Sequence, residues 1–195
     1  MSSVTERWII PVVGGVEDWK NQLKVVLQTL KKQDGYLRTR WGPCSENMQR
    51  LELLIGWKSI DACNTWKASS GFTAATDQMK TVQSGEAVSY FIRFVPYAPK
   101  EVIDASIVEV LTYSNCTIEE DKMRESVETA KSLPGCTGVA SGFSLDGATF
   151  VAVVGWASVE ESKAADKSLY VSAGGLTSET YHVNFRFPIK GFGGL

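Results

Sequence analysis

The chain has 195 residues, of which 44% are hydrophobic and 22% are charged, and its formal net charge is −2 at pH 7. Lysines and arginines are scattered among acidic residues, so there is no basic patch of the kind that binds nucleic acid or an anionic membrane. No apolar run approaches the roughly 20 residues that span a bilayer, and no secretory leader is visible. We therefore expect a cytoplasmic protein with neither nucleic acid nor membrane as a partner.

The first half of the chain alternates between strand-like and helix-like stretches. β-Branched and aromatic residues predict strands at 7–13, 36–41, 49–57 and 87–95. Apolar residues near helical spacing predict helices at 16–32 and 60–75, the second interrupted near 69–71. The proline-containing stretch 96–99 follows and is predicted to be a short, stiff linker.

The second half repeats this order. Strands are predicted at 105–113, 136–145, 148–156 and 181–187, and helices at 118–133 and 159–168. The dipeptide Asp146-Gly147 predicts a tight hairpin between the two middle strands.

Two stretches about a hundred residues apart also resemble one another. Residues 51–59 read LELLIGWKS and residues 150–158 read FVAVVGWAS, each an apolar run that ends in Gly-Trp-x-Ser. Self-similarity at this period predicts a tandem repeat, with one unit at 1–97 and the other at 98–195. Each unit has the β-α-β-β-α-β order of a ferredoxin-like α+β fold, whose sheet carries helices on one face only. We expect the two sheets to pack face to face as a pseudo-dimeric α/β barrel.

A short motif in the first unit points to a family. The segment 57–72 follows the pattern W-K-S-x-x-A-x-x-x-W-x-x-S-x-x-F, and the second unit has a weaker version, WASVEE, at 156–161. The pattern resembles the signature region of the dimeric α/β-barrel superfamily, and is closest to antibiotic biosynthesis monooxygenase-like domains. The resemblance implies a tandem member of a group that includes cofactor-independent oxygenases of polyketide quinones, haem-degrading enzymes and polyketide cyclases.

The chain departs from that family at two positions. Members commonly place histidines where Trp66 and Gly71 stand here. These departures argue against a mechanism that depends on a helix histidine, and against haem ligation. The only histidine is His182, and the four cysteines form no Cys-x-x-Cys pair, so no zinc site is expected. No dinucleotide or phosphate-binding glycine motif is present either, and we expect no cofactor and no metal.

His182 is the candidate for proton transfer. In a strand at 181–187, His182, Asn184 and Arg186 alternate onto one face. A histidine, an amide and a guanidinium in this order can position an enol, phenol or carbonyl, with His182 as general acid or base. The alternative is that these three residues form the solvent-exposed face of the strand.

Three further residues are candidates for substrate binding. In the strand at 36–41, Tyr36, Arg38 and Arg40 are predicted to share one face, where Tyr36 and Arg40 would anchor an acidic or phenolic ligand. Trp66 lies near Phe72 in a helical segment and would cap a pocket between helix and sheet. The alternatives are a solvated strand face for the first group, and packing in the core for Trp66.

Two functions are therefore considered. The first is a cofactor-independent oxygenase, cyclase or isomerase of secondary metabolism, acting on a small aromatic or polyketide-like molecule in an apolar pocket. The resemblance implies that substrate class, and the residues permit it: His182 would be catalytic, and Tyr36, Arg40, Trp66, Asn184 and Arg186 would bind substrate. The second is a non-catalytic stress-related, scaffold or ligand-binding protein with a packed barrel. Whether the chain forms a homodimer stays open.

Overall fold

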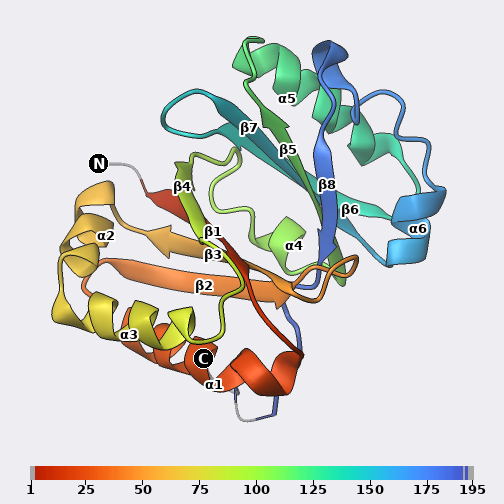
Figure 1. The fold of residues 1–195 in the computed structure, drawn as a ribbon. Helices are drawn as coiled ribbons and strands as arrows, with labels where there is room; N and C mark the ends of the chain where they lie inside the picture. Colours follow the sequence, from red (N-terminus) through yellow and green to blue (C-terminus); the bar gives the residue numbers. More distant parts are fainter. Residues whose placement is uncertain (1–2, 191, 193–195) are drawn as a thin grey trace. The chain divides into compact units, whose positions relative to one another are not determined.

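The computed structural model describes residues 3–190 and 192, and contains two four-stranded sheets with helices (Figure 1). By its internal contacts the chain divides into two compact units, the first formed by residues 1–89 with 187–195 and the second by residues 90–186. In the part of the chain that is described, no helix is both long enough and apolar enough to cross a membrane.

The first sheet and its helices account for the first half of the chain. The elements are β1 (Val4–Pro11), α1 (Val16–Leu30), β2 (Tyr36–Pro43), β3 (Arg50–Trp57), α2 (Ile60–Lys67), α3 (Ser70–Lys80) and β4 (Val88–Ile92). The strand order is β2-β3-β1-β4, and β3 is antiparallel to both β1 and β2. The predicted interruption of the second helix is real, because Ser69 caps α3 by accepting a hydrogen bond from the Phe72 N–H at 3.2 Å.

The second half has the same order with shorter helices. It contains α4 (Lys100–Ile103), β5 (Ile107–Ser114), α5 (Glu120–Glu128), the 3₁₀ turn η1 (Thr129–Ser132), β6 (Cys136–Phe143), β7 (Thr149–Trp156), α6 (Val159–Ala164), η2 (Ala173–Gly175) and β8 (Glu179–Val183). The strand order β6-β7-β5-β8 is that of the first sheet. The prediction of two tandem ferredoxin-like α+β repeats is confirmed. The face-to-face packing of the sheets and the boundary at 97/98 stay predictions.

One face of each sheet carries the large aromatic residues and most of the helices, whereas α4 packs against the opposite face of the second sheet, where Val102 meets Gly138 and Gly155. Trp57 on β3 contacts Trp66 of α2, and α1 buries its apolar stripe of Trp19, Leu23, Val26, Leu27 and Leu30. In the second unit, Trp156 lies in a core cluster with Leu111, Val127 and Tyr170. The duplicated tryptophans of the Gly-Trp-x-Ser motif thus anchor the helices on equivalent sheets.

A β-bulge at the start of β2 changes which residues share a face. Tyr36 lies opposite Trp57, whereas Arg38 lies opposite Gly56 and Arg40 opposite Leu54. Residues directly opposite one another on paired strands share a face of the sheet, and side chains alternate between the two faces along each strand. Because Trp57 and Leu54 are an odd number of positions apart on β3, their side chains lie on opposite faces. Tyr36 and Arg40 therefore lie on opposite faces of the sheet, and the prediction that they share one is wrong. The second unit has the same irregularity between Cys136 and Gly138.

A buried ion pair lies on the face of the first sheet that does not carry Trp57. Arg7 and Glu52 are both fully buried, with Nε to Oε2 at 2.8 Å and Nη2 to Oε1 at 2.7 Å. Arg50 Nη2 lies 3.1 Å from the same Glu52 oxygen. Removing each ion from water costs several kcal/mol, so a buried ion pair is tolerated only when its hydrogen bonds are as short and well aligned as those of Arg7 and Glu52.

We expect Glu52→Ala to lower the free energy of unfolding by about 3–5 kcal/mol, because it leaves the Arg7 guanidinium buried without its carboxylate. Urea denaturation measures this loss. The matched control is the double variant Arg7→Met/Glu52→Leu, which removes both charges and is expected to lose far less. Equal losses in the two variants would contradict the assignment of the loss to the broken Arg7–Glu52 ion pair.

Candidate functional site

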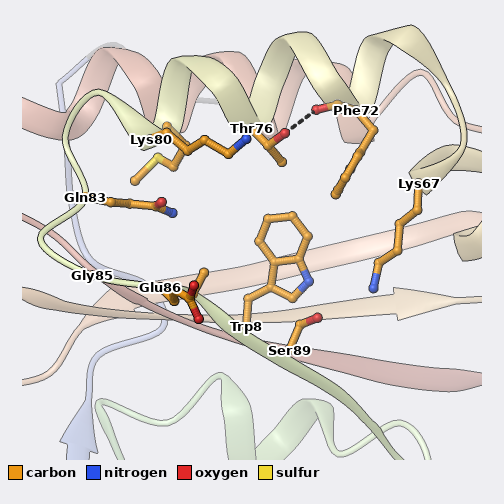
Figure 2. A pocket seen from close by; sticks show the side chains of 11 residues that line it. Trp8, Lys67, Phe72, Thr76, Lys80, Gln83, Gly85, Glu86 and Ser89 are labelled. Atoms are coloured by element: carbon orange, nitrogen blue, oxygen red, sulfur yellow. Dashed lines mark hydrogen bonds between the residues drawn. The ribbon is translucent and has the colours of Figure 1, made fainter.

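A cavity of about 540 Å³ lies in the first unit, between α3 and β1. Its walls come from β1, the end of α2, α3, the stretch that leads into β4 and the start of β4: Trp8, Lys67, Phe72, Thr76, Met79, Lys80, Gln83, Gly85, Glu86, Ala87 and Ser89. Figure 2 shows the Trp8 ring between Lys67 on one side and Gln83 and Glu86 on the other. The volume is in the range of pockets that hold small organic ligands.

The apolar wall of this cavity is part of an aromatic cluster. The ring of Trp8 stacks on that of Trp66 at 5.7 Å, with an interplanar angle of 20°. Phe72 meets both rings edge-on, at 6.2 Å from Trp8 and 4.9 Å from Trp66. Because the rings fix one another, Trp8 presents a rigid aromatic surface to the cavity.

Glu6 is the buried polar centre behind this wall. Its carboxylate is fully buried and accepts from four donors: Lys67 Nζ at 2.6 Å, Trp8 Nε1 at 2.6 Å, Trp57 Nε1 at 3.1 Å and Cys63 Sγ at 3.2 Å. Four donors compensate the cost of removing the carboxylate from water. Glu6 therefore holds the Trp8 ring and the Lys67 ammonium in place together.

The Lys67 side chain is one of two cations that line the cavity, the other being Lys80 of α3. Lys67 is 30% exposed and lines the cavity while its ammonium pairs with Glu6. A positive charge beside an aromatic wall favours a ligand oxygen that carries, or can acquire, negative charge.

The remaining polar groups lie along α3 and the following stretch. Thr76 Oγ1 donates to the Phe72 carbonyl at 2.9 Å, the contact dashed in Figure 2. Lys80 also lines the cavity, and its ammonium pairs with Asp77 at 2.9 Å. Glu86 is the only carboxylate among the lining residues, with Gln83 and Ser89 as neutral polar groups. The site thus combines an apolar wall, two ammonium groups and one carboxylate.

Trp66 is the sequence-predicted residue that lies nearest this cavity. It is 1% exposed and is not itself a lining residue. It packs behind Trp8 and Phe72, so it supports the wall rather than capping a pocket.

Tyr36 and Arg40 are not among the lining residues either. Tyr36 meets Trp57 edge-on at 6.2 Å, and Arg40 Nη1 donates to the Thr39 carbonyl at 3.4 Å from the other side of β2. The bulge described above separates them, so the structure does not bring them together as one anchor.

His182 lies in the second unit and is buried, at 5% exposure. Its Nε2 is 2.7 Å from Ser162 Oγ, so the exposed-face alternative is wrong for this residue. Asn184 and Arg186 follow the end of β8 at Val183, and Asn184 Oδ1 accepts from the Arg186 N–H at 2.9 Å. The three residues therefore do not form one strand face, and the catalytic role of His182 stays a prediction.

The sequence reasoning missed Glu6, Trp8 and Lys67. Glu6 precedes the predicted strand start at residue 7, although Glu6 and Trp8 belong to β1 and alternate onto the same face. The available signal for a buried carboxylate was the position of Glu6, which lies between Thr5 and Arg7 directly before an apolar strand-like stretch.

Cys63 yields a pH prediction at this site. Burial, followed by the neighbouring Glu6 carboxylate, raises the pKa of the Cys63 thiol, whereas a thiol in the unfolded chain ionises near pH 9.0. Above pH 9 the unfolded chain has lost a proton that the folded chain keeps, so stability falls as the pH rises. We expect wild type to lose up to about 1.4 kcal/mol per pH unit relative to Cys63→Ala above pH 9. Urea denaturation from pH 7 to 10.5 measures this, and parallel stability curves would contradict it.

Comparison with known proteins gives matches at the level of structure only. No protein-family model matches the chain, and no curated protein sequence does. A solved structure named as an anthrone oxidase-like protein is 13% identical, with a TM-score of 0.69 over 94% of this chain and 92% of that one.

Two further solved structures are candidate monooxygenases. The one from Fusobacterium nucleatum is 10% identical, with a TM-score of 0.62 over 93% of this chain and 91% of that one. The one from Lactobacillus acidophilus NCFM is also 10% identical, with a TM-score of 0.59 over 94% and 93%. Identities this low show the fold alone. The chain therefore shares its α+β fold with these solved structures, and both ferredoxin-like repeats are matched along nearly the whole length.

Proposed function

We propose that the protein binds a small phenol or enol of the anthrone type in the cavity of the first unit and oxidises it with molecular oxygen, without a cofactor. The observation that carries the proposal is the Lys67 ammonium, held by the buried Glu6 at the edge of an aromatic cavity. The name of the anthrone oxidase-like neighbour supports this choice of substrate class.

The reaction converts a ring CH₂ opposite a carbonyl into a second carbonyl. Both hydrogens of that carbon leave, one oxygen atom of O₂ becomes the new carbonyl oxygen, and the other leaves as water. The first step removes a proton from the CH₂ group, and the negative charge moves to the original carbonyl oxygen. The resulting electron-rich enolate is the species that reacts with O₂.

Each residue of the cavity has a role in that first step. The Lys67 ammonium stabilises the developing oxyanion, in a setting where Trp8 and Phe72 exclude water and strengthen the interaction. The Trp8 face holds the flat ring system by stacking. We assign proton removal to Glu86, the carboxylate among the lining residues.

The alternative is a binding protein that returns the same ligand unchanged. It uses the cavity in the same way but needs no proton acceptor, so Glu86→Gln leaves binding and function intact. Under the oxidase proposal Glu86→Gln retains binding and loses turnover.

The first test uses anthrone as substrate, with anthraquinone formation and oxygen uptake as readouts. We expect Glu6→Gln/Lys67→Met to lower kcat/KM by about 100-fold, because it removes the charge that stabilises the oxyanion. The double change avoids leaving Glu6 buried as an unpaired carboxylate. The matched control is Glu109→Gln/Lys167→Met, which removes the corresponding ion pair of the second unit and leaves the cavity untouched. Binding without product would favour the binding-protein alternative, and neither binding nor product would overturn both.

A second test separates the cavity from the sequence-based assignment of His182. Because His182 does not line the cavity, we expect His182→Gln to leave kcat/KM within about twofold. Its cost is in stability, because the buried hydrogen bond to Ser162 is weakened. A large loss of turnover in a variant with an unchanged melting temperature would instead support His182 as the catalytic residue.

A further inference from the structure

The two units carry the same buried glutamate, tryptophan and lysine. Glu6 pairs across the sheet with Ile55, and Glu109 pairs with Val154. Ile55 and Val154 each lie two residues before the tryptophan of a Gly-Trp-x-Ser motif. The indole N–H of Trp57 donates to Glu6 at 3.1 Å, and that of Trp156 donates to Glu109 at 3.0 Å.

The lysines of the two units are equivalent as well. Lys67 lies 2.6 Å from Glu6, and Lys167 lies 2.5 Å from Glu109. Both glutamates are fully buried. The polar centre of the cavity in the first unit is therefore present a second time.

What surrounds this centre differs between the units. In the first unit the lysine opens onto the cavity. In the second, Lys167 Nζ is 2.7 Å from Ser162 Oγ, which is in turn 2.7 Å from His182 Nε2. The Ser162 hydroxyl thus links the lysine of the second unit to His182.

Tyr170 lies on the other side of the second glutamate. Its side chain is fully buried and its hydroxyl donates to Glu109 Oε2 at 3.1 Å. The ring packs in the core cluster with Leu111 and Trp156, and the Tyr113 hydroxyl donates to the Tyr170 carbonyl. Burial and the Glu109 charge raise the pKa of Tyr170, so its hydroxyl stays protonated and acts as a donor.

Tyr170 belongs to the stretch that follows the second helix pattern. In the first unit the corresponding stretch forms α3, whose side chains line the cavity; in the second, α6 ends at Ala164 and the chain continues irregularly through residue 172. The chain thereby brings a phenol side chain to the buried glutamate–lysine pair.

We propose that the second unit contains a second copy of the phenol site, closed by the chain's own Tyr170. The inference rests on the proposed function, because it takes the ligand of the first cavity to be a phenol or enol. Tyr170 places a phenol ring beside the second glutamate–lysine pair: its hydroxyl donates to Glu109, as Trp8 and Cys63 donate to Glu6 in the first unit, and its ring packs near the motif tryptophan. Each chain accordingly has one open site and one closed site.

The experiment opens the closed site. Tyr170→Gly removes the ring and Cβ, which leaves room for 4-fluorophenol with its fluorine in place of Cβ. We expect fluorine NMR to show one bound 4-fluorophenol signal in wild type and two in Tyr170→Gly. Fluorobenzene is expected to bind the new site about tenfold more weakly, because it cannot restore the donor that Glu109 has lost.

The matched control is Tyr170→Phe, which keeps the ring and removes only the hydroxyl, and it is expected to show one signal. One signal in Tyr170→Gly, or equal affinity of the new site for fluorobenzene and 4-fluorophenol, would overturn the inference. No signal in wild type and one in Tyr170→Gly would support the second site while contradicting phenol binding in the first.

If Tyr170→Gly proves too unstable to titrate, its melting temperature is measured with each probe. A rise in 4-fluorophenol that exceeds both the rise in fluorobenzene and the rise of wild type in 4-fluorophenol supports the inference, since only ligand that binds the folded state stabilises it. Equal rises would overturn it.

Discussion

A carboxylate buried beneath tryptophans is the constraint on which the first unit depends. Without compensation Glu6 would cost several kcal/mol, and its four donors come from β1, β3 and α2. Satisfying the charge therefore fixes α2 against the sheet and orients the Trp8 ring. It also leaves the Lys67 ammonium at the edge of the space beneath α3. The aromatic wall of the cavity and the position of Lys67 at its edge follow from one electrostatic requirement.

The second unit satisfies the same requirement with different partners. Glu109 keeps the motif tryptophan and the lysine, but a tyrosine hydroxyl replaces the indole of Trp8 and the thiol of Cys63. Because α6 stops at Ala164, the chain beyond it is free of helical geometry and can bring Tyr170 into the core. The first unit, in which regular helix continues through α3, thus has the open site. The second unit, in which helix ends at Ala164, has the site that Tyr170 fills.

The periodicity of apolar residues was sufficient to predict the order of strands and helices. The duplicated Gly-Trp-x-Ser motif was sufficient to predict that the chain contains two repeats. Local irregularities made the predictions of shared strand faces wrong. The bulge at Tyr36 and the end of β8 at Val183 each break the alternation on which those predictions depended. The glutamate–lysine pair had no local signal, because Glu6 and Lys67 meet only once α2 packs on the sheet. Pairing of distant charges is a tertiary property, which is why the cavity could not be predicted while the fold could.

The contrast between the units also bears on the choice between a ligand site and a packed scaffold. A unit selected for stability alone gains by filling the space above its sheet, since each unfilled volume loses dispersion contacts and apolar burial. The second unit fills that space with Tyr170, so the architecture permits a packed solution. The first unit instead keeps about 540 Å³ between α3 and β1, beside a cation that its own buried carboxylate holds in place. An open space that the same fold can close is the physical argument that favours the proposal of a ligand site over that of a packed scaffold.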